Sequence, residues 1–146
     1  IIMGLKYENI LVAVDGSEAA DKAFNKSLFF AKTYEARLII THVVDSRSFA
    51  TVEAYDRTLS ERAEEHAKEL LAEYVKKAEE MGVTNVVTCI KFGSPKVVIS
   101  KEIAEEFNVD IIICGATGLN AVERFLIGSV SESITRHAPC DVLVVR

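Results

Sequence analysis

Five short apolar runs, separated by longer segments of helical pattern, most constrain how this chain can fold. The runs are rich in valine, isoleucine and leucine, which is typical of strands buried on both faces. They cover residues 9–14, 37–44, 83–92, 110–114 and 141–145. Buried strands that alternate with helices predict a parallel sheet whose crossover helices cover both faces. We therefore expect one α/β domain over residues 1–146, built on a doubly wound, five-stranded parallel sheet.

The segments between these runs carry signals for helix starts and stops. Predicted helices run from Ser17 to about Tyr34, from about Asp56 to Met81, from Ser94 onward and from Ser129 to His137. Ser17 is a typical helix cap, Pro95 fits a first helical position, and Gly82 is a typical stop. The longest helix is expected to bury a stripe formed by Leu59, Ala63, Ala67, Leu70, Tyr74, Ala78 and Met81. Its lysine and glutamate residues are expected to form a solvated face.

Charge and cysteine content argue against several classes of function. The chain has 17 basic and 22 acidic residues and a net charge of −5, whereas nucleic-acid binding needs a basic face. No apolar run reaches the roughly 18 residues of a membrane-spanning helix, and the N-terminus lacks signal-peptide features. The three scattered cysteines, Cys89, Cys114 and Cys140, fit a reducing cytoplasm better than a disulfide framework or a zinc site. We expect a cytoplasmic protein without nucleic-acid or membrane partners.

A glycine-rich stretch from Gly115 to Ser131 directly follows the fourth apolar run. In a doubly wound sheet this stretch lies beyond the carboxyl ends of the strands, where such folds bind ligands. Glycines let backbone N–H groups approach a ligand, and the helix start at Ser129 offers unpaired N–H groups with a partial positive charge. An anion is therefore the expected ligand. A Walker A loop, a GxGxxG fingerprint and a nucleophile elbow are all absent from the sequence.

The spacing of these glycines resembles the ATP-binding branch of the universal stress protein family. The family motif, G-2x-G-9x-G-[S/T], is matched by Gly115, Gly118, Gly128 and Ser129. The resemblance covers nearly the whole chain, including VAVDGS at 12–17, HVVD at 42–45, GSP at 93–95 and PCDVLVV at 139–145. It implies a Rossmann-like fold of the adenine nucleotide alpha hydrolase type with strand order 3-2-1-4-5. It also implies a homodimer, and the apolar edge strand Asp141–Val145 is the expected contact.

The resemblance further implies that the ligand is ATP, ADP or AMP, with Mg²⁺ or Mn²⁺ on its phosphates. Adenine is expected near the backbone of Val43, with Ala13 and Val14 lining the same cleft. Asp15 is expected at the ribose or at the phosphate-bound metal, because a carboxylate and a triphosphate repel each other unless a cation intervenes. The remaining expected contacts are Cys114, Gly115, Thr117, Gly118, Gly128, Ser129, Val130 and Ser131. Thr117 stands where relatives often carry a larger residue.

Each of these assignments has a structural alternative. The glycines could serve only as turns, and Asp15, Ser129 and Ser131 could serve only as helix caps. If the glycines bind the ligand, Gly115 and Gly118 leave room for ribose and phosphate against bare backbone. His42 and Cys114 are expected to be structural, Arg124 to be solvated or in contact with phosphate, and Phe125, Leu126 and Ile127 to anchor their loop on the core.

Three functions are compatible with this sequence. We favour a sensor or regulatory module in which nucleotide occupancy orders the loop at 117–127. The second is slow ATP hydrolysis or phosphoryl transfer, disfavoured because the motif fixes no lysine, arginine or water-orienting residue. The third is a nucleotide-free interaction scaffold, against which the intact glycine set argues. No catalytic residue is therefore assigned.

Overall fold

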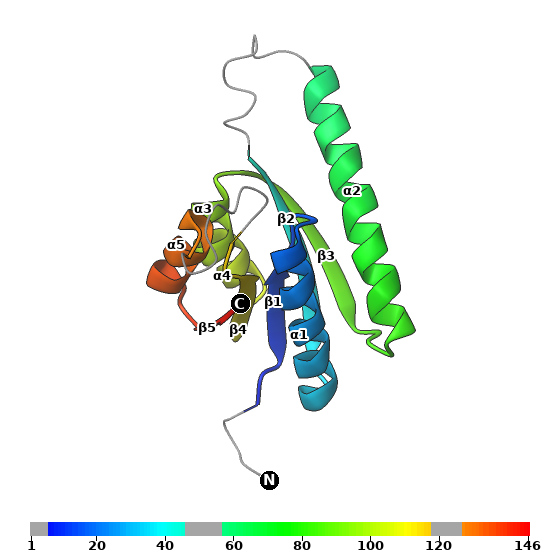
Figure 1. Ribbon diagram of the computed structural model, residues 1–146, viewed down its shortest axis with the longest axis vertical. Coiled ribbons are helices and arrows are strands. Elements are labelled where there is room, and N and C mark those ends of the chain that lie inside the picture. The colour runs from blue at the N-terminus through cyan, green and yellow to red at the C-terminus, as the bar shows by residue number, and fades with distance from the viewer. Residues whose placement is uncertain (1–5, 46–56, 118–126) are drawn as a thin grey trace.

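The computed structural model describes residues 6–45, 57–117 and 127–146, and its centre is one five-stranded sheet (Figure 1). The strands are β1 (Asn9–Ala13), β2 (Arg37–Asp45), β3 (Val86–Gly93), β4 (Ile111–Gly115) and β5 (Asp141–Val145). They lie in the order β3-β2-β1-β4-β5, and every neighbouring pair is parallel. The predicted parallel sheet and its strand order are thus confirmed.

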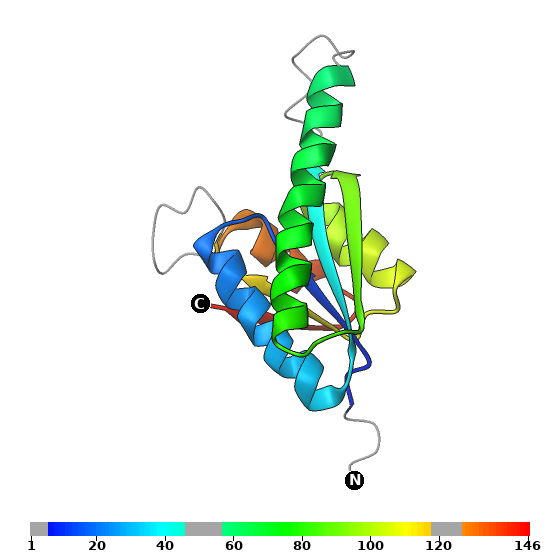
Figure 2. The same cartoon turned by 90° about the vertical axis from the view of Figure 1, so that its right-hand side faces the viewer.

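Helices cover both faces of this sheet (Figures 1 and 2). One face carries α1 (Glu18–Tyr34) and α2 (Arg57–Glu80). The other carries α5 (Ser129–His137) and one continuous helical segment made of α3 (Pro95–Val97), a π-helical stretch (Val98–Ile103) and α4 (Ala104–Glu106). None of the described helices combines the length and the hydropathy needed to span a membrane.

Alternate residues of each strand build two separate cores. In β1, the side chains of Ile10 and Val12 pack with α1 and α2, whereas Leu11 packs with the helices of the opposite face. β4 repeats this pattern, with Ile113 on the first face and Ile112 on the second. Because strand side chains alternate between faces, apolar residues at consecutive positions are what a sheet covered on both sides requires.

The end of α2 differs from its predicted form. Met81 is 55% exposed, whereas Leu71, outside the predicted stripe, is 2% exposed. The helix ends at Glu80, so Met81 lies in the turn that follows it. Gly82 is left-handed with φ 82°, as its predicted stop role requires, and Val83 donates its N–H to the Ala78 carbonyl. Val83 therefore belongs to the helix stop, and the strand predicted from residue 83 begins at Val86.

Tyr7 links the segment before β1 to β5, and its ionisation makes the stability of the fold depend on pH in the alkaline range. Its hydroxyl donates to Asp141 Oδ2 at 2.7 Å, and chiefly this bond raises the pKa of Tyr7 from 10 to about 12. Because the pKa of Tyr7 is higher in the folded than in the unfolded state, the protonated hydroxyl contributes its full stabilisation below pH 10. This contribution is lost as the pH rises towards 12. Burial, followed by a hydrogen bond to Asp21, also raises the pKa of Tyr74.

We expect the free energy of unfolding, measured in urea, to fall between pH 10 and pH 12. Tyr7→Phe keeps the ring and removes the ionising hydroxyl, so its decline over this range should be shallower. A residual decline is expected because Tyr74 still titrates. Equal slopes for the wild-type protein and Tyr7→Phe would contradict the role given to the bond with Asp141.

Candidate functional site

The chain changes direction at the carboxyl ends of β1 and β4. From β1 it continues into α1 on one face of the sheet, and β4 is followed along the chain by α5 on the other face. Neighbouring strands whose connections leave to opposite faces form the switch point at which doubly wound sheets bind ligands. Most predicted site residues lie at this edge: Ala13 at the end of β1, Val14 and Asp15 directly after it, Val43 in β2, Cys114 to Thr117 at β4, and Gly128 to Ser131 at α5.

The turn after β1 holds the carboxylate of Asp15 in a fixed place. Asp15 Oδ1 accepts the N–H of Ser17 at 2.9 Å, and Ser17 Oγ accepts the N–H of Ala20 at 3.1 Å. Ser17 is thus the cap of α1, as predicted, and Gly16 makes the turn possible with φ 84°. In the described part of the chain Asp15 Oδ2 makes no hydrogen bond. The half-buried carboxylate therefore keeps one oxygen for another partner.

At the same edge, Val43 lies just beyond the last residue pair of the ladder between β1 and β2. Val14 donates its N–H to the Thr41 carbonyl at 2.9 Å, so the odd-numbered residues of β2 bond towards β1. The next step of a parallel ladder would join the Val43 N–H to the Val14 carbonyl. That carbonyl instead accepts from His42 Nδ1 at 2.8 Å, which gives the imidazole the structural role predicted for it. Among the described residues the Val43 N–H has no hydrogen-bond partner.

The N-terminus of α5 lies next to the carboxyl end of β4. Gly128 occupies the cap position with φ −63° and ψ 157°, and its own N–H donates to the Ala116 carbonyl at 2.6 Å. The first intrahelical bond runs from the Glu132 N–H to the Gly128 carbonyl at 3.0 Å. The N–H groups of Ser129, Val130 and Ser131 consequently have no acceptor in the helix, and they carry the positive end of its dipole.

Close packing against α1 requires glycine at position 115. A Cβ atom at this position would lie 2.8 Å from the Ala19 carbonyl oxygen and 2.9 Å from Ala19 Cβ. The first turn of α1 therefore packs directly against Gly115, and a ligand contact at this residue stays a prediction. At Gly128 the nearest atom to an added Cβ would be the Ala116 carbonyl oxygen, at 3.4 Å, which is ordinary contact.

Cys114 and Ser131 are both buried. Cys114 is 4% exposed, and burial raises the pKa of its thiol to about 11, so it is a packing residue as predicted. Ser131 donates its hydroxyl to the Gly115 carbonyl and thereby joins α5 to β4. Neither Ser129 nor Ser131 caps the helix through its side chain, because Gly128 holds the cap position. From Cys114 and Ser131, backbone groups are what a ligand could use.

Several predicted positions belong to the connection between β4 and α5. Thr117 is half-buried beside Gly128. Ile127 is 43% exposed, so its predicted role as a loop anchor on the core is wrong. Gly118, Arg124, Phe125 and Leu126 lie outside the described residues. Within the described ranges, no group of three or more histidine, cysteine or acidic side chains could hold a metal ion, and a metal bound through phosphate at Asp15 stays a prediction.

Comparisons with known proteins agree on one family. A model of the universal stress protein family matches residues 6–146. A relative from Staphylococcus haemolyticus that carries this family's name is 54% identical over 142 residues, which are 97% of this chain and 86% of the relative. Universal stress protein UspA from Lactobacillus plantarum has a TM-score of 0.85 at 35% identity, over 97% of this chain and 99% of its own. A universal stress protein solved in complex with cAMP has a TM-score of 0.71 at 25% identity, over 97% and 98%.

Proposed function

Because the chain belongs to the universal stress protein family, we propose that it is a regulatory module that binds an adenine nucleotide, ATP above all, between β1 and β4. The observation that carries this proposal is two sets of backbone N–H donors, on the two sides of the switch point, that have no acceptor among the described residues. One is the Val43 N–H, and the other is the N-terminus of α5. The complex of a related universal stress protein with cAMP supports the choice of an adenine nucleotide.

The backbone of Val43 in β2 suits an adenine base. Adenine presents a hydrogen-bond donor, its amino group, beside an acceptor, the ring nitrogen N1. The N–H and C=O of Val43 project together towards the end of β1 and offer the complementary acceptor and donor. Val14 and Ala13, at the end of β1, are apolar neighbours for the base. Guanine carries the opposite pattern at these positions, so the same backbone pair should reject it.

The α5 side suits phosphate. Three backbone N–H groups at the positive end of a helix form a general anion site. Glu132 in the first turn of α5 and the Asp15 carboxylate oppose a bare triphosphate, and the chain has a net charge of −5. We therefore include Mg²⁺ or Mn²⁺ on the phosphates, with Asp15 Oδ2 directed to a ribose hydroxyl or to that cation.

The proposal also covers assembly and location. β5 is the last strand of the sheet, its four apolar residues are half-buried, and in the described chain it pairs with β4 alone. An apolar edge of this kind supports a homodimer formed through Asp141–Val145. Cys89, Cys114 and Cys140 are all free thiols, which supports a reducing cytoplasm as the site of action. No catalytic residue is proposed, so the module would act through occupancy.

Mass spectrometry of gently purified protein, followed by calorimetric titration, tests this function. We expect co-purified ATP, ADP or AMP, and saturable binding of Mg²⁺–ATP by the stripped protein with a Kd on the order of micromolar. GTP is the matched control, and it should bind at least about tenfold more weakly because it reverses the donor and acceptor at Val43. Neither co-purified nucleotide nor heat at millimolar ATP would contradict the proposal.

A further inference from the structure

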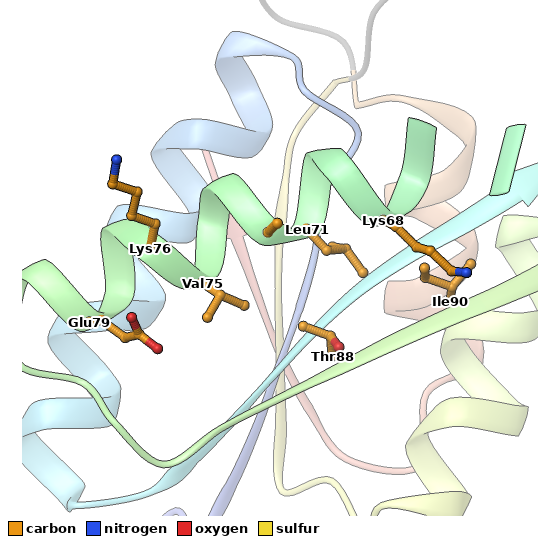
Figure 3. A pocket seen from close by; sticks show the side chains of 8 residues that line it. Lys68, Leu71, Val75, Lys76, Glu79, Thr88 and Ile90 are labelled. Carbon is orange, nitrogen blue, oxygen red and sulfur yellow. The ribbon is translucent and has the colours of Figure 1, made fainter. Parts of the chain in front are cut away.

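A groove lies between α2 and β3. Its volume is about 330 Å³, and it is lined by Lys68, Leu71, Ala72, Val75, Lys76, Glu79, Thr88 and Ile90. Leu71 is buried, and Val75 and Ile90 pack against the same core, so the floor is apolar. Figure 3 shows the side chains of Leu71 and Val75 from α2 directed towards Thr88 and Ile90 of β3.

β3 borders this groove with an unpaired backbone edge. It is the end strand of the sheet, and all of its described pairing is with β2, from Leu38↔Val86 to Asp45↔Gly93. Leu38 donates its N–H to the Asn85 carbonyl at 2.9 Å, so the odd-numbered residues of β3 bond to β2. The even-numbered residues Thr88 and Ile90 therefore turn their N–H and C=O groups outward. These same two residues line the groove with their side chains.

Among the described residues, nothing supplies the usual protection of an edge strand at β3. Natural edge strands often carry a lysine, a proline or a bulge that prevents further pairing. β3 contains no proline, and its ladder with β2 runs without interruption over eight residue pairs. Its one lysine, Lys91, is held on the opposite face by Glu106 at 3.2 Å and Glu102 at 3.7 Å. As far as the described residues show, the outward edge at Thr88 and Ile90 is thus open to another strand.

Charges mark the two ends of the groove. Lys68 lies beside Ile90, towards the carboxyl end of β3, whereas Glu79 lies at the other end, where the side chain of Lys76 is directed away from β3 (Figure 3). Lys68 has only loose contacts with Glu64 and Glu65, both at 3.8 Å, and its side chain is 56% exposed. The two charged positions are separated by about 16 Å along α2, the span of about five residues of an extended chain.

We propose that this groove binds an extended peptide segment of a partner protein, which adds as a sixth strand along the outer edge of β3. Main-chain hydrogen bonds to Thr88 and Ile90 hold the peptide, and alternate apolar side chains enter the groove over Leu71 and Val75. An acidic residue of the peptide lies at Lys68 and a basic residue at Glu79. A small molecule could fill the apolar floor, but only an extended backbone matches the unpaired groups of the strand edge.

Two synthetic nonapeptides serve as probes in an NMR titration of ¹⁵N-labelled protein. In the first, Glu, Val, Val and Lys alternate with threonines in that order, and in the second the order of these four is reversed. We expect saturable amide shifts centred on Thr88, Ile90, Leu71 and Val75, with one peptide preferred because the groove is charged differently at its ends. A version of the preferred peptide with N-methylated backbone amides should bind at least tenfold more weakly.

Two protein variants complete the test. Thr88→Pro removes the outward N–H without removing a bond to β2, and it should weaken peptide binding at least tenfold. Lys68→Glu combined with Glu79→Lys exchanges surface charges and should reverse the preference between the two peptides. Lys22→Glu combined with Lys26→Glu, on the exposed face of α1, is the control and should leave both affinities unchanged.

Four results would overturn the proposal. The first is the absence of shifts at millimolar peptide. The second is that the peptide binds Thr88→Pro, or the N-methylated peptide binds the wild-type protein, with unchanged affinity. Either result would mean that the groove recognises side chains or a small apolar ligand. The third is an unchanged peptide preference in the charge-exchange variant. The fourth is conversion of a dimer to a monomer by Thr88→Pro in light scattering, which would identify a second copy of this chain as the occupant.

Discussion

Replacing Gly115 with alanine is expected to lower the free energy of unfolding by about 1–3 kcal/mol, and by more if the contact cannot relax. The added Cβ would lie 2.8 Å from the Ala19 carbonyl oxygen and 2.9 Å from the Ala19 carbonyl carbon and Cβ. These are atoms of the first turn of α1, which is held in place by the cap at Ser17, so they cannot move as the end of a flexible side chain could. Thermal unfolding should show a fall in Tm of roughly 3–10 °C.

Gly128→Ala is the matched control for this substitution. Its Cβ would have the Ala116 carbonyl oxygen as nearest neighbour at 3.4 Å, and the residue already has a negative φ of −63°. We therefore expect a change in the free energy of unfolding within about 1 kcal/mol, set mainly by the weaker capping of alanine. If the two variants lose equal stability, close packing against α1 is not the reason for glycine at position 115.

Ser129→Pro is expected to weaken ATP binding about 10- to 100-fold while the fold is retained, because it removes one N–H from the proposed phosphate site. Ser129 is the first residue of α5, where proline fits because this N–H has no acceptor in the helix. The preceding residue, Gly128, already has the extended conformation, φ −63° and ψ 157°, that a following proline requires. Calorimetric titration with Mg²⁺–ATP measures the effect.

Ser129→Ala separates the backbone group from the hydroxyl. It removes the exposed side-chain oxygen and keeps the N–H, so its effect on ATP affinity should be no more than a few-fold. Circular dichroism should show the helical content of both variants unchanged. Wild-type affinity in a folded Ser129→Pro protein would show that the N-terminus of α5 does not hold the phosphates.

The predictable parts of this fold are those that local sequence specifies. Continuous apolar runs identify all five strands, and the bounds of α5 and β5 match their predicted residues, Ser129–His137 and Asp141–Val145. Local capping chemistry also fixes the start of α1 at Ser17 and the left-handed conformation of Gly82. Periodicity alone misjudged Met81, since it does not show that a helix ends one residue earlier. The π-helical stretch at Val98–Ile103 has no local signal in the sequence.

The unpredicted parts of the site depend on contacts between segments far apart in the chain. The reason for glycine at position 115 is Ala19, which lies 96 positions earlier, and no pattern around either residue reports their contact. Likewise, His42 donates to the Val14 carbonyl, so the Val43 N–H has no partner among the described residues. This is a result of the register between β1 and β2. The alternation of side chains along the second apolar run is enough to predict that His42 lies on the same face of the sheet as Leu38 and Ile40. This alternation cannot predict that the Val14 carbonyl lies next to the imidazole ring of His42.

The most direct test of the proposed nucleotide site is an NMR titration of ¹⁵N-labelled protein with Mg²⁺–ATP. If adenine binds at the end of β2 and phosphate at the start of α5, the largest amide shifts will be those of Val43, Ser129 and Val130, and they will saturate at one nucleotide per chain. Resonances of the groove between α2 and β3, including Thr88 and Ile90, should stay unchanged. No shift at millimolar nucleotide, or shifts that leave Val43 and the first turn of α5 unaffected, would contradict the site.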